Sequence, residues 1–562
     1  MPIDIKQKRA RKLHTKFIFV SGGVISSVGK GVTTSSIAAL LQARGLKVSP
    51  VKCDAYLNVD AGTIRPQEHG EVFVTVDGME TDQDLGNYER FLNIDLSGSN
   101  YVTNGQIYLK IITKERNFEY EGEDVEVALH VPEEIIDRLE AAAEEQNADV
   151  VICEIGGTVG EYQNMLFIEA NRIMKYRHGR DCIHIHVGYL PTPPSIGEMK
   201  SKPVQNSVRQ LVASGIQPDI LIGRAEAVLD TRRKETLSWT CNIPVKQIFS
   251  APNASSIYEV PELFERQGMA DMICSLLNIT PPKKVNLGPW RKLGLKINKI
   301  KTSKELSIAV VGKYFETGDY KLADVYISVV EAIKHAGWHL ELNPKLYWVS
   351  SLNIEKEGAD KYLKGMDAVV VPGGFGSRGT EGIIQAIKYA RENKKPFLGL
   401  CFGLQLAVIE FARNVCGIIK ATSSEIEPKS SHAVIHMMPE QEKKLLNREY
   451  GATMRLGNWE CQLNKKGKTY ELYKKLNRLS TDSNPIILER HRHRYECNNA
   501  YRELLEENGL MISGTTPDGR LVEVIELIDH PYFVATQFHP EFTSRPFDPH
   551  PLFVGLLKIA KS

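Results

Sequence analysis

Short apolar runs followed by glycine-rich turns and helical stretches recur along this chain, and this alternation constrains its fold more than any other feature. In the first half the runs occupy residues 17–20, 149–153, 182–187 and 219–222, and helical stretches lie at about 33–44 and 133–146. A second series of runs occupies residues 306–311, 368–371 and 396–400. Buried strands that alternate with helices are typical of a parallel sheet with helices on both faces. We therefore expect two α/β domains in succession.

The segment between the two series is rich in proline, glycine and lysine. It lacks clear helical periodicity and is predicted to be an interdomain linker over 283–305. With 562 residues the chain is also too long for one ordinary hydrophobic core. We expect a basic arm over 1–16, a first domain over 17–282 and a second domain over 306–562.

The composition argues against several classes of function. The formal net charge is +1, which gives no strong field toward nucleic acid or a membrane surface, and no apolar run approaches the roughly 20 residues of a membrane helix. The nine cysteines include no C-x-x-C pair, so neither a disulfide framework nor a zinc site is expected. The basic start has no apolar stretch behind it, unlike a secretory signal. We expect a cytoplasmic protein with no nucleic-acid or membrane partner.

The sharpest local motif is Gly-Leu-Cys-Phe-Gly at residues 399–403, between a predicted strand and a predicted helix over 404–413. It has the form of a nucleophile elbow with Cys401 in place of serine. The flanking glycines permit a strained turn, and the N-terminus of the following helix stabilises a thiolate. A lone cysteine between glycines is more often a small buried apolar residue, so this interpretation depends on partners elsewhere in the chain.

Such partners occur at two other strand ends. His539 can relay the proton of the thiol, and Glu541 can fix the orientation of the imidazole. The Val-Pro-Gly-Gly-Phe-Gly turn at 371–376 can aim a backbone N–H at a developing oxyanion, and the N–H of Phe402 would supply a second. Each motif alone has an ordinary structural explanation. Their order and their placement at strand ends together favour a Cys-His-Glu triad.

The loop at residues 21–32, Ser-Gly-Gly-Val-Ile-Ser-Ser-Val-Gly-Lys-Gly-Val, joins a predicted strand to a helix as a phosphate-binding loop does. We expect its N–H groups to hold phosphate oxygens and Lys30 to reach the β and γ phosphates. The loop departs from the Walker pattern, because Gly31 stands where Ser or Thr usually binds Mg²⁺. Carboxylates are therefore expected to hold the metal ion, with Asp84 and Glu154 as candidates.

The second half resembles a class I glutamine amidotransferase domain in its turn at 371–376, its elbow and its His-Pro-Glu motif. The resemblance implies release of ammonia from L-glutamine through a glutamyl thioester on Cys401. An arginine fork suits the α-carboxylate of glutamine and a glutamate suits its α-ammonium group. The implied glutamine contacts are Gly374, Phe402, Gly403, Leu404, Gln405, Glu425 and Arg494.

The first half resembles the synthetase domain of the CTP synthase family. The resemblance lies in the runs GGVISSVGKG, HGEVFVTVDGMETDQDLGNYERF and VICEIGGTVG and in Lys-Ser-Lys-Pro-Val-Gln at 200–205, and the domain order agrees over nearly the whole chain. It implies a P-loop-type doubly wound parallel sheet followed by a flavodoxin-like class I amidotransferase sheet. The implied activity is ATP-dependent amination of UTP to CTP through 4-phosphorylated UTP.

The same resemblance implies roles for individual residues. ATP contacts are implied at Ser27, Val28, Gly29, Lys30, Gly31, Val32 and Asp84, with Lys30 and Lys52 in phosphoryl transfer and Mg²⁺ on Asp84 and Glu154. Contacts to UTP or to CTP, the product and feedback inhibitor, are implied at Ser26, Glu161, Tyr162, Gln163, Lys200, Ser201, Lys202, Pro203, Val204 and Gln205. Activation by GTP and a homotetramer are further traits of the family.

Two positions depart from the family pattern. After Gly160 the family usually has Asp-Ile-Glu, whereas this chain has Glu-Tyr-Gln, and a neutral Gln163 would weaken a hydrogen bond to ribose. We therefore expect altered feedback inhibition by CTP. Thr236 stands where the family has a lysine, and any of Arg232, Arg233 and Lys234 could replace that lysine.

Two alternatives remain at this point. A corrin-ring amidase also joins a P-loop ligase to an amidotransferase-like domain, but it lacks the run at 200–205. An inactive, filament-forming or regulatory scaffold is the alternative outside enzymes, and the intact Cys401, His539, Glu541 and Lys30 argue against it.

Overall fold

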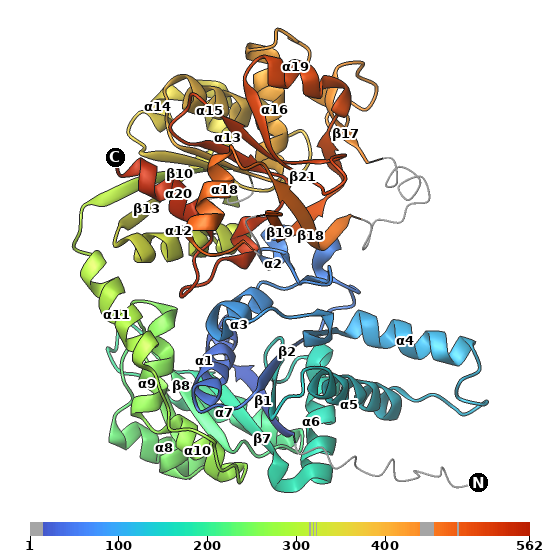
Figure 1. Cartoon of the computed structure of the whole chain (residues 1–562). Helices are drawn as coiled ribbons and strands as arrows, with labels where there is room; N and C mark the ends of the chain where they lie inside the picture. Colours follow the sequence, from blue (N-terminus) through green and yellow to red (C-terminus); the bar gives the residue numbers. More distant parts are fainter. Residues whose placement is uncertain (1–14, 314–315, 318–319, 322, 439–453, 480–482) are drawn as a thin grey trace. The chain divides into compact units, whose positions relative to one another are not determined.

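The computed structural model describes residues 15–313, 316–317, 320–321, 323–438, 454–479 and 483–562, so most of the predicted basic arm lies outside the described residues. The chain forms two compact units (Figure 1). The first unit holds the residues up to Asp60 together with Asn87–Leu295, and the second holds Ala61–Gly86 together with Lys296–Ser562. Among the described residues, none of the helices combines the length and the apolar character needed to span a membrane.

The first unit is built on a seven-stranded sheet in which all strand pairs are parallel. Its strand order is β5 (Tyr101–Thr103), β2 (Val48–Asp54), β6 (Val150–Ile155), β1 (Lys16–Gly23), β7 (Cys182–Tyr189), β8 (Ile220–Arg224) and β9 (Ile248–Ala251). The first strand of the chain lies inside the sheet, and the later strands extend from it in both directions. This arrangement confirms the predicted doubly wound parallel sheet, and the four predicted strands are β1, β6, β7 and β8.

Helices cover this sheet, and its central strands β2, β6 and β1 are buried along almost their whole length, as expected for a parallel sheet covered on both faces. The helices are α1 (Lys30–Ala43), α4 (Asn104–Arg116), α5 (Val127–Glu145), α6 (Met165–His178), α7 (Lys202–Ala213), α8 (Thr231–Cys241), α9 (Val260–Arg266) and α10 (Met269–Leu276). Phe17 and Phe19 of β1 belong to the core formed with α4, α5 and α6. The helices predicted at 33–44 and 133–146 correspond to α1 and α5.

The second unit is built on a nine-stranded mixed sheet. Five parallel strands come first in the order: β13 (Asn343–Ser350), β10 (Glu305–Gly312), β14 (Ala368–Val371), β15 (Phe397–Leu400) and β23 (Phe533–Thr536). Four strands continue the sheet with antiparallel pairing: β22 (Val522–Leu527), β21 (Leu510–Thr515), β18 (Arg455–Leu463) and β19 (Ile486–His493). The parallel half is the predicted amidotransferase sheet, and the antiparallel extension was not predicted.

Side chains of β14 and β15 alternate between two cores, as the period of two along a strand requires. Val369 and Val371 pack with α13 (Ser351–Glu357), α15 (Thr380–Glu392) and α16 (Phe402–Asn414). Val370 and Leu400 pack with α12 (Ile327–Leu340) and α20 (Pro551–Ala560). In the described part of this unit, further helices are α2 (Pro66–His69), α14 (Asp360–Leu363), α18 (Lys468–Lys475) and α19 (Arg502–Glu507). The strands β16 (Thr422–Ser423), β17 (Ala433–Met437) and β20 (Tyr495–Cys497) form a small sheet.

Residues 61–86 interrupt the first unit in the sequence and pack in the second. They contain the short antiparallel pair β3 (Phe73–Val74) and β4 (Glu80–Thr81). The carboxylate of Glu71 accepts hydrogen bonds from the backbone N–H of Ser328, at 3.1 and 3.2 Å, and from its hydroxyl. The sequence did not indicate that this segment of the first half would pack in the second unit.

The predicted linker at 283–305 contains a helix, α11 (Gly288–Ile300). Its buried residues Trp290, Leu293, Ile297 and Ile300 follow helical spacing, which the surrounding prolines, glycines and lysines obscured in the sequence. The domain limits themselves stay a prediction.

Candidate active site

The three motifs of the predicted triad site meet because β14, β15 and β23 are adjacent parallel strands. Val371 is in register with Gly399, and Leu400 is in register with Thr536. The turn at 372–376 directly follows β14 and Cys401 directly follows β15, while His539 stands three residues after the end of β23. Motifs separated by more than a hundred residues therefore lie at the same edge of the sheet.

Cys401 occupies a strained turn between β15 and α16. Its φ is 50° and its ψ is −95°, a backbone conformation that residues other than glycine rarely adopt. The flanking glycines are required for another reason, namely close contact. A Cβ on Gly403 would lie 2.5 Å from the carbonyl oxygen of Val371, and a Cβ on Gly399 would lie 2.9 Å from the backbone of Gly403. Cys401 itself carries the strain, and the glycines let the helix approach the sheet.

His539 and Glu541 form a buried pair beside the elbow. Nδ1 of His539 lies 2.7 Å from Oε1 of Glu541, and the backbone N–H of His539 donates to the carbonyl of Arg490 at 2.8 Å. Burial lowers the pKa of His539, but the charges of Glu541 and Cys401 outweigh it and raise that pKa to about 10. Nε2 makes no well-aligned hydrogen bond to another described residue. The imidazole of His539 is therefore protonated at neutral pH.

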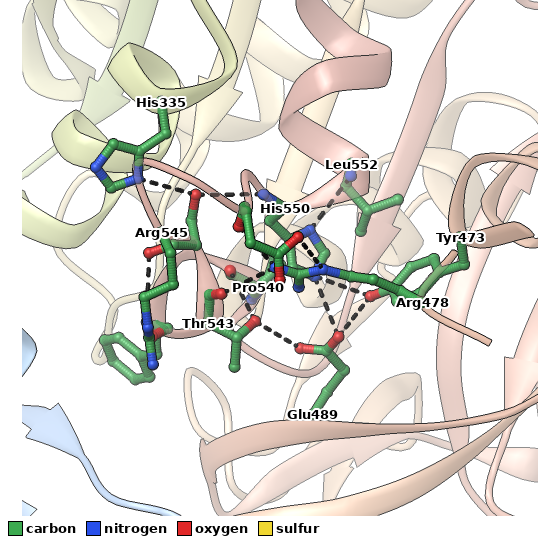
Figure 2. A network of polar contacts seen from close by, with 12 residues as sticks. His335, Tyr473, Arg478, Glu489, Pro540, Thr543, Arg545, His550 and Leu552 are labelled. Carbon is green, nitrogen blue, oxygen red and sulfur yellow. Dashed lines mark hydrogen bonds and ion pairs between the residues drawn. The ribbon is translucent and has the colours of Figure 1, made fainter. Parts of the chain in front are cut away.

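A buried polar network supports the turn that carries Glu541 (Figure 2). Glu489 of β19 accepts from the Tyr473 hydroxyl at 2.6 Å, from His550 Nε2 at 3.1 Å and from the Thr543 hydroxyl at 3.3 Å. The N–H of Leu552 donates to Nδ1 of His550, so Nε2 carries the proton. Thr543 closes the turn by a bond to the carbonyl of Pro540. Sequence reasoning missed Glu489, because nothing in its local motif distinguishes it from a solvated charge.

The turn at 372–376 is held by two charged residues. The N–H of Gly376 donates to Oε1 of Glu425 at 2.8 Å, and Nζ of Lys313 donates to the carbonyl of Gly376 at 2.6 Å. Lys313 also lies 4.5 Å from the ring centroid of Phe402. Burial lowers the pKa of Lys313 to about 8, and burial raises the pKa of Glu425. Lys313 follows the first strand of this half, and its position after an apolar run was the only signal that could have found it.

The other predicted glutamine contacts lie around the same turn. Burial lowers the pKa of Arg494, and the charge of the nearby Glu425 offsets a small part of this effect. Phe402, Gly403, Leu404 and Gln405 form the first turn of α16, and Nε2 of Gln405 donates to the carbonyl of Tyr495 at 2.9 Å. Leu404 is fully buried, so a contact with glutamine would come from its backbone.

In the first unit, the predicted phosphate loop joins β1 to α1. Gly29 precedes the helix with a φ of 97°, and Ser27 has a φ of 54°. Nζ of Lys30 donates to the carbonyl of Gly157, which follows β6, at 2.7 Å. A Cβ on Gly23 would lie 1.6 Å from the hydroxyl oxygen of Ser207, so only glycine fits there. The N-terminus of α1 therefore faces the loop after β6 across the carboxyl ends of two paired strands.

Lys52 and Glu154 lie side by side on β2 and β6. Nζ of Lys52 is 3.1 Å from Oε1 of Glu154, and the Tyr88 hydroxyl donates to Oε2 at 2.5 Å. Sequence reasoning missed Tyr88. Asp84 begins α3 (Asp84–Leu92) and belongs to the second unit, where its N–H donates to Asp82.

Among the described residues, no group of three or more His, Cys, Asp or Glu side chains is arranged so that it could hold a metal ion by itself. A buried carboxylate such as Glu154 still fits Mg²⁺, which usually takes only one or two protein carboxylates and fills its other positions with water and phosphate oxygens.

A cavity of about 450 Å³ lies beside the phosphate loop. Its lining combines the turn after β6 with the start of α7 and comprises Val24, Thr158, Val159, Gly160, Glu161, Pro203, Asn206, Ser207 and Gln210. Glu161 and Pro203 are thus the predicted UTP/CTP contacts that line it. Tyr162 is 91% exposed, and Val204 is buried in the core.

Arg233, one of the candidate replacements for the lysine expected at residue 236, contacts the segment before α7. Nη2 of Arg233 is 3.4 Å from Glu198, which also binds Lys200 at 2.6 Å. Arg233 is therefore tied to the loop before α7.

Comparison with known proteins agrees with this architecture. Residues 16–279 match the family model described as CTP synthase N-terminus, and residues 321–559 match the one described as glutamine amidotransferase class-I. The fold and these matches define the class: a glutamine amidotransferase joined to a nucleotide-dependent ligase. A CTP synthase of Carboxydothermus hydrogenoformans is 50% identical over 541 residues, covering 96% of this chain and 97% of that protein. A CTP synthase of Rippkaea orientalis is 48% identical over 548 residues, covering 97% and 96%.

The chain belongs to the CTP synthase family. It is a ligase that aminates UTP to CTP in an ATP-dependent reaction, with nitrogen from glutamine. This result favours the first interpretation over the corrin-ring amidase and the inactive scaffold. A solved glutaminase domain of a Trypanosoma brucei CTPS with bound acivicin is 37% identical, covers 46% of this chain and 94% of its own, and has a TM-score of 0.41.

Proposed function

We propose that Cys401, His539 and Glu541 form the catalytic triad of the glutamine half. The main support for this proposal is the strained backbone of Cys401 together with the buried imidazole of His539, whose Nδ1 lies 2.7 Å from Oε1 of Glu541. The thiolate attacks the side-chain carbonyl carbon of glutamine and forms a C–S bond. His539 gives its proton to the leaving nitrogen, and the C–N bond breaks with release of ammonia.

The second half-reaction uses the same imidazole in its neutral form. Once the sulfur is acylated it carries no charge, so one of the two charges that raise the pKa of His539 is lost. His539 then takes a proton from water, which attacks the thioester and regenerates the thiolate. Glu541 keeps Nδ1 as the protonated, oriented nitrogen in both steps.

Substrate recognition follows from the charges around the turn at 372–376. Arg494 binds the α-carboxylate of glutamine and Glu425 its α-ammonium group. The remaining predicted contacts, Gly374 and the first turn of α16, enclose the side-chain amide of glutamine. The backbone N–H of Phe402 lies in the first turn of α16, where N–H groups have no intrahelical acceptor, and it donates to the oxyanion.

In the ligase half, residues 27–32 bind the phosphates of ATP, and Lys30 and Lys52 stabilise the charge of the transferred phosphoryl group. Mg²⁺, held by Glu154 and Asp84, would neutralise phosphate charge when bound. UTP or CTP occupies the cavity lined by Glu161 and Pro203, with Ser26 and residues 162–163, 200–202 and 204–205 as further contacts. Phosphorylation makes O4 of UTP a good leaving group, and ammonia then replaces it.

Membership of the family supports four further properties. These are activation by GTP, feedback inhibition by CTP, assembly as a homotetramer and a cytoplasmic location.

Two nitrogen sources test the assignment. Cys401→Ala should abolish CTP formation from glutamine and leave CTP formation from ammonium chloride within about twofold of the unaltered enzyme. Glutaminase activity that survives this substitution would refute Cys401 as the nucleophile. Failure of the unaltered enzyme to make CTP from ATP, Mg²⁺, UTP and ammonia would refute the ligase assignment.

A further inference from the structure

A buried carboxylate from the synthetase part of the sequence lies within the glutamine half. Glu80 belongs to the region matched by the synthetase family model, but it stands on β4 in the second unit. It is 1% exposed, and a Cβ on Gly62 would lie 2.1 Å from its Oε2, so the carboxylate is tightly enclosed. Its position is therefore fixed by packing.

Glu80 pairs with an arginine that touches two parts of the triad site. Nε of Arg492 donates to Oε1 of Glu80 at 2.7 Å. The guanidinium group of Arg492 lies 5.1 Å from the ring centroid of Phe375, in the turn at 372–376. The carbonyl oxygen of Arg492 lies 3.7 Å from Sγ of Cys401. Arg492 thus connects Glu80 with both the turn at 372–376 and Cys401, the proposed nucleophile.

The segment around Glu80 is anchored independently of this pair. Nη1 of Arg490 donates to the carbonyl of Val74 at 3.0 Å, and the N–H of Asn458 donates to that of Val76 at 2.9 Å. Glu71 binds Ser328 of α12. Loss of the Glu80 charge therefore leaves several anchors of the segment in place.

Charge balance gives Glu80 a second effect. Burial lowers the pKa of Arg494, the charge of Glu80 offsets part of this effect, and the charge of Arg492 adds to it, so all three groups lie close enough to interact. Without Glu80, the two guanidinium groups would repel one another in a site of low dielectric constant. Arg492 would then move away from Phe375, because a buried charge without its partner is costly.

We propose that Glu80 is a positioning residue for the glutaminase reaction, and that it acts by holding Arg492 against Phe375 beside Cys401. The proposal rests on the proposed role of Cys401. It assigns to a residue of the synthetase sequence a function in the chemistry of the other half. A displacement of about 1 Å in such a turn can cost roughly a hundredfold in rate, so the effect should be measurable.

Glu80→Gln keeps the shape and removes the charge. We expect kcat/KM for glutamine hydrolysis to fall roughly tenfold to a hundredfold, mainly in kcat, while ammonia-dependent CTP formation stays within about twofold. The matched control is Glu71→Gln, which neutralises a buried carboxylate in the same segment that binds Ser328. This control should leave kcat for glutamine hydrolysis within about threefold.

The route through Arg492 is tested by combining substitutions. If Glu80 acts through Arg492, adding Glu80→Gln to Arg492→Gln should lower kcat less than twofold further. The proposal fails if Glu80→Gln leaves glutamine hydrolysis unchanged, if it slows the ammonia and glutamine reactions equally, or if Glu71→Gln has the same effect. None of these outcomes depends on the Cys401→Ala result, which tests the proposed function separately.

Discussion

The network around Glu489 offers a sharp test of how the proposed triad is supported. Replacement of Glu489 by leucine removes the acceptor of two strong hydrogen bonds, from Tyr473 at 2.6 Å and from His550 at 3.1 Å (Figure 2). Hydrogen bonds to a charged group contribute about 1.5–3 kcal/mol each, so their sum is about 3–6 kcal/mol. Part of this loss is offset, because the contact between Tyr473 and His550 at 2.9 Å remains and because the variant no longer buries a carboxylate. We expect a net loss of about 3 kcal/mol in the free energy of unfolding.

Glu489→Gln is the matched control, because its amide oxygen can still accept from Tyr473 and His550. We expect this variant to lose about 1 kcal/mol. Urea unfolding of the full chain, followed by tryptophan fluorescence, measures both losses. Because Thr543 loses a partner as well, the turn carrying Glu541 should loosen in Glu489→Leu, and glutaminase kcat should fall roughly tenfold.

The pH dependence provides an independent readout. Burial raises the pKa of Glu489, but His550 and Tyr473 outweigh it and hold the pKa below its ordinary value. The stabilisation from this carboxylate is therefore present above about pH 4.3, the unfolded value, and is lost as the pH falls through the lower folded value. The difference between the unaltered chain and Glu489→Gln should shrink in acid. A Glu489→Leu variant within about 0.5 kcal/mol of the unaltered chain, with full glutaminase activity, would refute this account.

Three further predictions concern other residues. Because the pKa of His539 is raised to about 10, the stability that comes from its pairing with Glu541 is fully present below about pH 6.5 and is lost as the pH rises through 10. Glu541→Gln should therefore have a lower free energy of unfolding than the unaltered chain, and unfolding experiments should show this difference shrinking between pH 7 and pH 10. Gln163→Glu should lower the inhibition constant for CTP, and an unchanged constant would exclude a role for residue 163 in feedback. Gly23→Ala should raise KM for UTP or destabilise the first unit by about 1–3 kcal/mol, because its methyl group would overlap Ser207; normal KM and stability would contradict the steric argument.

The amino-acid sequence by itself determined the local structure and the chemistry that depends on short motifs. Apolar runs at 17–20 and 368–371 predict strands, because full burial on both faces demands apolar side chains throughout. The elbow around Cys401 and the spacing of His539 and Glu541 carry their own chemical meaning, since a nucleophile, a base and its orienting carboxylate are recognisable from residue type and position at strand ends.

The tertiary structure alone decided which distant residues support these motifs. Lys313, Glu489 and the pair of Glu80 with Arg492 resemble solvated charges in the sequence, and their partners lie between 16 and 412 residues away. Pairing of β14, β15 and β23 in register brings the motifs of the proposed triad together, and the packing of residues 61–86 in the second unit brings Glu80 to Arg492. The physical reason is that a buried charge persists only where packing supplies a partner, and packing is a property of the whole fold rather than of any short stretch of sequence.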